Sequence, residues 1–399
     1  METAYVVDIL RTPIGRFGGT LASVRPDDLA AHVIKALVSR NPALPVNEME
    51  DVIFGAANQA GEDNRNVARM ALLMAGLPVE VAGTTVNRLC ASGLQSIMDA
   101  SRALLLGEGN AYIAGGVESM SRAPFVTAKA ETSYSRKVES YDTTIGWRFV
   151  NKKLADLYYP FSMGETAENV ADQWKITRDA QDAFANESQV RYDNAHKAEK
   201  FNEELVPVSV PQRKTDPIIF EKDEHPRLSS LEKLASLQPA FREKGTVTAG
   251  NSSGINDGAA ASLLVNEAIL KRYNLKPMAR VVSFAVAGVN PDIMGIGPVP
   301  ATKKALSRAG LTVNDLDLIE LNEAFASQSI ACIEELKLES SKVNVNGGAI
   351  AIGHPLGASG TRISATLLHE MKKRGSRYGL ATMCIGVGQG AAIIYENLA

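Results

Sequence analysis

Short apolar runs alternate with longer amphipathic stretches along much of this 399-residue chain. The runs at 4–9, 51–55 and 111–116 are bounded by turn residues and predict buried strands. Between the last two, apolar side chains recur at helical spacing over 91–106, and Gly107 marks the end of the predicted helix. Strands that alternate with helices predict mixed sheets covered by helices on both faces, which is an α/β fold.

The chain also matches itself. A shift of 267 residues, without a gap, places 46–54 on 313–321 and the tripeptide 91–93 on an identical tripeptide at 358–360. A tripeptide match alone would be weak, but here one offset serves two separate windows. This favours an internal duplication over the alternative of two unrelated α/β units.

The duplication divides the chain into two halves and an insertion. In the second copy we expect strands at 317–321 and 379–383 on either side of a helix at 359–373. The stretch between the copies is rich in charge and contains an expected polar helix at about 177–200, with Thr177 as its N-cap. An insertion of this size either shapes a binding site or only covers surface. The predicted units are the first half, 1–121, completed by about 250–272; an inserted loop domain, 122–249; and the second half, 273–399.

The composition is that of a soluble globular protein, with 45% hydrophobic and 22% charged residues. A net charge of −3 gives no general attraction to nucleic acid or to acidic membranes. No apolar run approaches the roughly 20 residues of a membrane span. The three cysteines have no metal-ligand spacing and favour a reducing compartment over a disulfide framework. No secretory signal is recognisable, so a cytoplasmic enzyme without a metal is expected.

Three glycine-rich segments each hold one reactive side chain, namely Cys90, His354 and Cys384. A thiol, an imidazole and a second thiol can serve as nucleophile, base and acid, a set that suits acyl transfer through a covalent thioester. Cys90 precedes the predicted helix at 91–106, where the helix dipole and free N–H groups are expected to lower the pKa of its thiol. The alternatives are a buried structural cysteine and a loop histidine with one structural hydrogen bond.

Neighbouring residues add to this set. Asn322 follows the predicted strand at 317–321, a common position for site residues in α/β folds, although it could also simply occupy a turn. The glycine run at 386–390 is weak as a dinucleotide motif, because no strand–turn–helix unit with a downstream acidic residue follows. Its N–H groups can instead serve as oxyanion donors. Cys332 lies in an apolar helical pattern and is expected in the core.

Taken in order, the motifs of the chain resemble those of the thiolase family across essentially its whole length. They are NRLCASG (87–93), GGVESMSRAP (115–124), MGETAENVA (163–171), VTAGNSSGINDGAA (247–260), MGIGPVPA (294–301), NEAFA (322–326), GGAIAIGHPLGASG (347–360) and CIGVGQG (384–390). The resemblance implies the thiolase fold. In that fold, two duplicated α/β halves have mixed five-stranded sheets covered by helices, in αβαβα layers, with an inserted loop domain.

The resemblance also implies roles for individual residues. Cys90 matches the nucleophile that becomes acylated, His354 the histidine that activates it, and Cys384 the second acid/base cysteine. Asn322 matches the asparagine that holds a water in one oxyanion hole, and Gly386 with the Cys90 amide matches the donors of the second. The positions that match contacts to coenzyme A are Met163, Arg227, Ala249, Gly250, Ser253, Met294, Ala324 and Phe325, with Arg227 near the nucleotide.

The activity implied is the CoA-dependent, reversible thiolytic cleavage of a 3-ketoacyl-CoA through acyl-Cys90. No permanently bound cofactor is expected, and the family resemblance implies a homotetramer, a dimer of dimers. Segments 58–78 and 134–151 look most like the β-ketoadipyl-CoA thiolases of bacterial aromatic degradation. Such an enzyme would form succinyl-CoA and acetyl-CoA.

Charge complementarity offers three basic residues for a dicarboxylic acyl chain, namely Arg148, Lys152 and Lys153. Two alternatives remain open. One is an acetoacetyl-CoA thiolase with a small acyl pocket. The other is a non-catalytic protein that binds CoA or lipid on the same scaffold, and the presence of Cys90, His354 and Cys384 argues against it.

Overall fold

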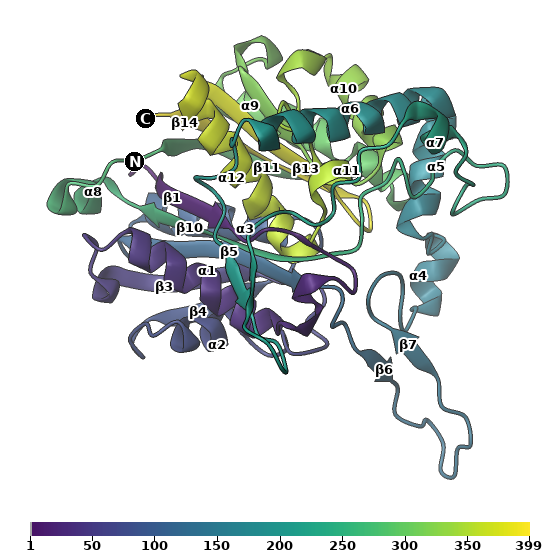
Figure 1. The fold of residues 1–399 in the computed structure, drawn as a ribbon, viewed down its shortest axis with the longest axis horizontal. Helices are drawn as coiled ribbons and strands as arrows, with labels where there is room; N and C mark the ends of the chain where they lie inside the picture. The colour runs from purple at the N-terminus through teal and green to yellow at the C-terminus, as the bar shows by residue number, and fades with distance from the viewer. Residues whose placement is uncertain (1) are drawn as a thin grey trace.

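The computed structural model of the chain describes residues 2–399, and its main sheet contains the strands of both predicted copies (Figure 1). In the first half the strand order is β4-β3-β5-β10-β1. The bounds are β1 (Tyr5–Arg11), β3 (Met49–Gly55), β4 (Ala82–Val86), β5 (Ala111–Ser119) and β10 (Asn256–Val265), with β2 (Gly15–Arg16) paired to β10. Every residue of β5 and β10 is buried, as expected for strands covered on both faces. The three strands predicted in this half are confirmed.

The second half repeats this order. Its strands run β12-β13-β14-β11, with bounds β11 (Ala279–Gly288), β12 (Leu318–Leu321), β13 (Tyr378–Ile385) and β14 (Gln389–Asn397). β3 is parallel to β5, and β12 is parallel to β13 in the same place. A single bridge between Ile319 and Val343 stands where β4 stands in the first half. The second half therefore has four strands and a bridge instead of the predicted five strands.

The two halves join edge to edge between β1 and β11, through the pairs Tyr5 with Arg280 and Val6 with Ala279. These pairs link all of the strands into one ten-stranded sheet. β10 enters the first half from beyond the insertion and lies between β1 and β5. The exact domain boundaries at 121 and 249 stay predictions.

Two central helices contact strands of both halves. They are α3 (Ser92–Leu106) and α12 (Leu356–Arg374), and the offset of 267 carries 92–106 onto 359–373 within α12. A Cβ at Gly93 would lie 2.7 Å from the Gly357 carbonyl oxygen, and one at Gly360 would lie 2.1 Å from the Leu94 nitrogen. Because the offset also relates Gly93 to Gly360, the same glycine on each helix lets the two backbones meet.

The outer helices cover the sheet and close its two cores. Apolar side chains of α1 and α2 pack on the first half, and those of α9 and α10 pack on the second. The bounds are α1 (Pro26–Arg40), α2 (Val67–Met74), α8 (Glu267–Tyr273), α9 (Pro298–Ala309), α10 (Ala326–Leu336) and α11 (Ala349–Ile352), with short 3₁₀ segments at Thr20–Ser23, Val46–Glu48, Pro291–Ile296, Val313–Asp315 and Ser340–Lys342. Cys332 lies on α10 with no exposed surface, as predicted.

The insertion forms an arm and a helical layer. Figure 1 shows the β6–β7 hairpin projecting from the body, with α4, α5, α6 and α7 along one side. The bounds are β6 (Phe125–Thr127), β7 (Ser140–Asp142), α4 (Lys152–Leu157), α5 (Met163–Trp174), α6 (Arg178–Lys197), β8 (Val208–Val210), β9 (Ile218–Phe220) and α7 (Leu231–Ala235). The predicted polar helix is α6, and the Thr177 hydroxyl accepts from the Ala180 N–H at 3.2 Å as its N-cap.

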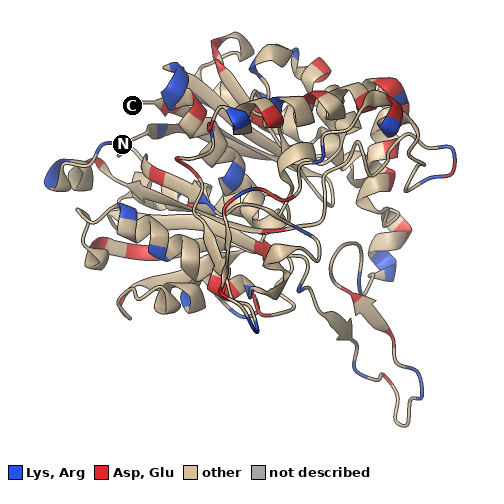
Figure 2. Ribbon diagram, viewed as in Figure 1, with Lys and Arg blue, Asp and Glu red and all other residues tan. Residues whose placement is uncertain are grey.

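Lys and Arg positions are mixed with Asp and Glu positions along the outer helices and loops of the ribbon (Figure 2). No helix within residues 2–399 is long and apolar enough to cross a membrane. The same residues contain no group of three or more His, Cys, Asp or Glu side chains placed to hold a metal ion.

Candidate active site

Cys90 lies in the turn between β4 and α3, directly before Ala91, the N-cap of the helix. Leu89 adopts a left-handed backbone with φ 47°. Its amide donates to Asn87 Oδ1 at 2.8 Å, and its carbonyl accepts from the Ser92 hydroxyl at 2.7 Å. Asn87 Nδ2 also donates to the Ala57 carbonyl at 2.9 Å. These bonds fix a tight turn that would otherwise be strained, and the turn sets the position of Cys90.

The thiol of Cys90 carries a raised pKa. Burial raises this pKa to about 11, and the nearby Glu118 carboxylate acts in the same direction, while the nearby Gly386 N–H acts to lower it. The predicted lowering at the helix N-terminus is therefore wrong. The reason is that loss of contact with water disfavours the thiolate more than the N–H groups favour it. A base must generate the nucleophile when it is needed.

His354 is held in one orientation in the loop between α11 and α12. Its amide donates to Asn256 Oδ1 at 2.9 Å. Nδ1 lies 2.6 Å from the Ser359 hydroxyl oxygen, and that hydroxyl donates to the Pro355 carbonyl at 2.9 Å. Because a hydroxyl has one proton, Nδ1 must be the donor to Ser359. Nε2 then carries no proton and lies 3.4 Å from Asn322 Nδ2.

The imidazole of His354 is neutral over the physiological range. Burial lowers its pKa to about 3, and the positive charge of the buried Arg362 adds to this effect. Nη1 of Arg362 lies 3.6 Å from Oε2 of Glu320, which belongs to β12. A neutral imidazole with a bare Nε2 is able to accept a proton from a thiol.

Cys384 lies near the end of β13 and is buried. Burial raises the pKa of its thiol well above the ordinary value, and the charge of the nearby Cys90 is the second cause. The thiol therefore keeps its proton at neutral pH. It packs in an apolar cluster whose members are Met163, Ala167, Val247, Met294, Ala324 and Phe325.

Two further predicted residues lie around the thiols. Asn322 follows β12, and its backbone N–H donates to the Thr382 carbonyl at 3.0 Å. The side-chain Oδ1 of Asn322 is buried and has no hydrogen-bond partner within residues 2–399. Gly386 lies in the turn between β13 and β14, where a Cβ would stand 3.4 Å from both Leu89 Cδ1 and Met163 Sδ. The structure thus brings Cys90, His354, Cys384, Asn322 and Gly386 from both halves into one region.

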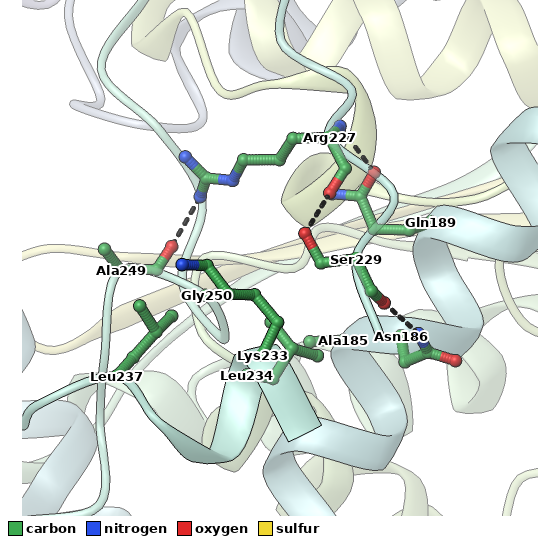
Figure 3. A pocket seen from close by; sticks show the side chains of 10 residues that line it. All are labelled: Ala185, Asn186, Gln189, Arg227, Ser229, Lys233, Leu234, Leu237, Ala249 and Gly250. Carbon is green, nitrogen blue, oxygen red and sulfur yellow. Dashed lines mark hydrogen bonds between the residues drawn. The ribbon is translucent and has the colours of Figure 1, made fainter. Parts of the chain in front are cut away.

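A cavity of about 200 Å³ lies beside α6 and α7 (Figure 3). Three of the predicted CoA positions line it, namely Arg227, Ala249 and Gly250. The Arg227 guanidinium donates to the Ala249 carbonyl, and burial lowers its pKa. Figure 3 shows the Lys233 side chain extending toward the same carbonyl. Lys233 was not among the positions predicted from the sequence, because it lies on the short helix α7, whose place beside the cavity is set by packing.

The remaining predicted CoA positions lie around Cys384 or next to residues that do. Met163, Met294, Ala324 and Phe325 belong to the apolar cluster around Cys384. The Ser253 N–H donates to the Ala324 carbonyl at 3.0 Å. Val247 is in the same cluster, and Ala249 and Gly250 follow it in the chain and line the cavity. The predicted positions therefore form two groups, one lining the cavity and one around Cys384, which residues 247–250 join along the chain; together we call them the strip.

Glu118 is a second residue that the sequence reasoning left without a role. Its carboxylate is buried on β5 and accepts from the N–H groups of Ala57 at 2.9 Å, Asn58 at 3.1 Å and Gly357 at 2.8 Å. Burial raises its pKa to about 7. The bond to Gly357 ties the first half to the start of α12. An acidic residue at the end of an otherwise apolar strand was the available signal.

Comparison with known proteins places this geometry in a family. The model of the thiolase N-terminal domain matches residues 4–268, and that of the thiolase C-terminal domain matches residues 275–397. The chain belongs to the thiolase family, whose enzymes are acyltransferases. The predicted resemblance and fold class are confirmed.

Three similar proteins span the full length of the chain. It is 53% identical to a β-ketoadipyl-CoA thiolase of Acinetobacter baylyi, with 100% of both chains covered. It is 54% identical to a 3-oxoadipyl-CoA/3-oxo-5,6-dehydrosuberyl-CoA thiolase of Escherichia coli K12, again with 100% of both covered. The crystal structure of a Bacillus anthracis acetyl-CoA acetyltransferase has a TM-score of 0.94 and 41% identity, and the match covers 100% of this chain and 99% of that one.

Proposed function

We propose that the chain cleaves β-ketoadipyl-CoA with CoA to give succinyl-CoA and acetyl-CoA. The observation that carries the proposal is the gathering of Cys90, His354 and Cys384 from the two halves into one region, with His354 neutral and Cys384 protonated. The names of the relatives supply the substrate. The conserved chemistry of the family supplies the reaction, and the roles below follow from the positions of the residues.

In the first step the Cys90 thiol transfers its proton to Nε2 of His354, and the sulfur attacks the 3-keto carbon. The high pKa of the thiol and the low pKa of the imidazole oppose this transfer in the ligand-free site. Thiolate and imidazolium form together, however, so each stabilises the other in a region of low dielectric. The pair persists only as long as the attack requires it.

In the second step the bond between the second and third carbons breaks, which leaves the acyl group on Cys90 and an acetyl-CoA enolate. Cys384 donates its proton to the enolate carbon. The buried Oδ1 of Asn322 and the nearby His354 suit a bound water that would donate to the enolate oxygen. The CoA sulfur then attacks acyl-Cys90, and the Gly386 and Cys90 amides stabilise the oxyanion that forms. The bond from the acyl carbon to Cys90 breaks and releases succinyl-CoA. The proton of the CoA thiol restores Cys384, and the imidazolium of His354 returns its proton to Cys90.

The strip from the cavity to the thiols suits the shape of CoA. The basic Arg227 and Lys233 suit its phosphates, and the apolar cluster with Met163 and Phe325 suits its pantetheine arm. CoA and its thioesters are substrates in this scheme, and no permanently bound cofactor takes part.

We further propose that the enzyme works in the cytoplasm as a homotetramer, a dimer of dimers. Apolar side chains on the projecting arm support an association between copies, because Phe125, Tyr134 and Val138 are 73%, 99% and 77% exposed. Light scattering coupled to gel filtration tests the assembly. A monomeric mass at micromolar concentration would contradict it.

A thiolysis assay with CoA tests the activity, with β-ketoadipyl-CoA and acetoacetyl-CoA as parallel substrates. The proposal expects faster turnover of β-ketoadipyl-CoA. Equal or faster turnover of acetoacetyl-CoA would instead favour the second candidate, an acetyl-CoA acetyltransferase, to which the B. anthracis structure is similar. No turnover of either substrate would point to a non-catalytic protein that binds CoA.

A further inference from the structure

The structure separates the three basic residues that could meet a dicarboxylic acyl chain. Lys152 and Lys153 stand in the first turn of α4 and are exposed. Arg148, a few residues earlier, is half-buried. An exposed lysine is strongly hydrated and gives little selectivity, whereas a half-buried guanidinium offers a planar set of donors that matches a carboxylate. Arg148 is therefore the candidate that the structure favours.

Arg148 is a cation without an acidic partner. Its Nη2 donates to Asn58 Oδ1 at 3.1 Å. Within residues 2–399 the guanidinium makes no other recorded hydrogen bond and no ion pair. The two nearby arginines Arg25 and Arg122 differ, since both pair with Glu62. Partial burial of a cation is costly unless an anion accompanies it, and here the protein supplies none.

On one side Arg148 is tied to the wall that carries the nucleophile. Asn58, which holds the guanidinium, donates its amide to Glu118 at 3.1 Å. Glu118 lies close enough to Cys90 for its charge to act on the thiol. The carbonyl of Ala57, the residue before Asn58, accepts the hydrogen bond from the Asn87 side chain that fixes the turn at Cys90. Two residues of the 57–58 segment thus link the guanidinium to the place where the acyl group is attached.

On its other side, the segment that contains Trp147 and Arg148 is tied to the wall of the site that carries Met163. Trp147 Nε1 donates to the Phe161 carbonyl at 3.0 Å. Phe161 precedes the N-cap of α5, whose first residue, Met163, approaches Gly386. Trp147 and Arg148 therefore span the two walls of the site on the side of the acyl group.

We propose that Arg148 binds the second carboxylate of the acyl group carried by Cys90, and that it selects dicarboxylic acyl chains for this enzyme. The inference deepens the proposed function and rests on it. The relatives from A. baylyi and E. coli are named for acyl chains that end in a carboxylate. Asn58 engages one nitrogen and holds the guanidinium plane, which leaves the other donors for the substrate.

The test compares two substrates of equal chain length. β-Ketoadipyl-CoA ends in a carboxylate, and 3-ketohexanoyl-CoA ends in a methyl group. For Arg148→Gln we expect kcat/KM with β-ketoadipyl-CoA to fall by roughly 10- to 150-fold, the range for loss of a hydrogen bond to a charged group. We expect kcat/KM with 3-ketohexanoyl-CoA to stay level or rise. Lys152→Gln makes the same change of charge at an exposed position and should alter neither value.

Two results would overturn the role of Arg148. An equal loss with both substrates would mean that it only supports the fold, and no loss would mean that it does not contact the acyl chain. If Arg148→Gln does not fold, Arg148→Lys replaces it. Lysine keeps the charge without the planar donors, so it should reduce the preference for β-ketoadipyl-CoA and not abolish it. A wild-type enzyme that cleaves acetoacetyl-CoA but not β-ketoadipyl-CoA would instead refute the proposed substrate itself, and the role of Arg148 with it.

Discussion

Gly93 and Gly360 occupy the same position in the two copies of the duplication, and each allows the backbone of the other central helix to approach it. The Thr361 hydroxyl donates to the Gly93 carbonyl at 3.0 Å across the same contact. The contact brings the start of α3, next to Cys90, against the start of α12, next to His354. The spacing of the two helices therefore sets the spacing of nucleophile and base.

Gly360→Ala should destabilise the protein. Alanine favours a helix by about 1 kcal/mol over glycine, but its Cβ would meet the Leu94 nitrogen at 2.1 Å, which is backbone and cannot rotate away. We expect a net loss of roughly 1–3 kcal/mol in the free energy of unfolding. Chemical denaturation followed by circular dichroism measures it. Lys373→Ala, on the exposed side of the same helix, should stay within about 0.5 kcal/mol. A stable Gly360→Ala protein would show that the helices can separate without cost.

Cys90→Ala should abolish the covalent intermediate, because the other thiol of the site, Cys384, has its pKa raised well above the ordinary value and keeps its proton. We expect no acyl group on the protein after incubation with acetyl-CoA, and a fall in thiolysis of about 10⁴-fold or more. Intact-protein mass spectrometry detects the adduct. Cys332→Ala is the matched control, since that thiol is buried on α10 and donates to the Gly295 carbonyl. An adduct that persists without Cys90 would move the nucleophile elsewhere.

Cys384→Ser should separate the two half-reactions. Its thiol supplies the proton for carbon–carbon cleavage, and a serine hydroxyl is a much weaker acid. Acylation of Cys90 by acetyl-CoA does not need that proton and should be nearly unchanged. We expect thiolysis to fall by roughly 10²- to 10⁴-fold, as for loss of a general acid. Rapid-quench kinetics follows both steps, and an equal loss in both would assign Cys384 a structural role only.

The activity should tolerate mild acid better than an ordinary histidine would permit. The pKa of His354 is lowered from 6.5 to about 3, so the imidazole stays neutral far below pH 6.5. The acid limb of kcat/KM should therefore not fall near pH 6.5 through this group. The same shift stabilises the folded state above pH 6.5, and this stability is lost as the pH falls toward 3. A pH–rate profile tests the expectation, and an acid limb near 6.5 that disappears in His354→Gln would contradict it.

Much of this arrangement could be predicted from the sequence, because it depends on local pattern. The strand at 111–116 is set by its apolar run, yet the observed β5 continues to Ser119 and buries Glu118, since backbone pairing extends beyond the apolar residues. The internal match at 267 residues predicted the shared topology of the halves. The proposed catalytic positions were predicted from motifs that surround reactive side chains in the sequence.

Properties that arise from packing could not be predicted in this way. The pKa of Cys90 depends on burial and on Glu118 and Gly386, which are remote in sequence, so the local helix argument gave the wrong direction. Arg148 could not be told from Lys152, because their exposure differs only once α4 and Asn58 are in place. Lys233 likewise gained its place in the cavity only through the packing of α7 on α6.

The matched serines of the two central helices show what became of the duplication. Ser92 and Ser359 stand 267 residues apart, and each turns its hydroxyl back onto the preceding turn. The turn before α3 presents Cys90, and the turn before α12 presents His354. The proposed nucleophile and the proposed base therefore come from different copies, and neither copy contains both. Activity is consequently a property of the junction and not of either copy. An assay of turnover is therefore also a measure of whether the two copies have docked in register.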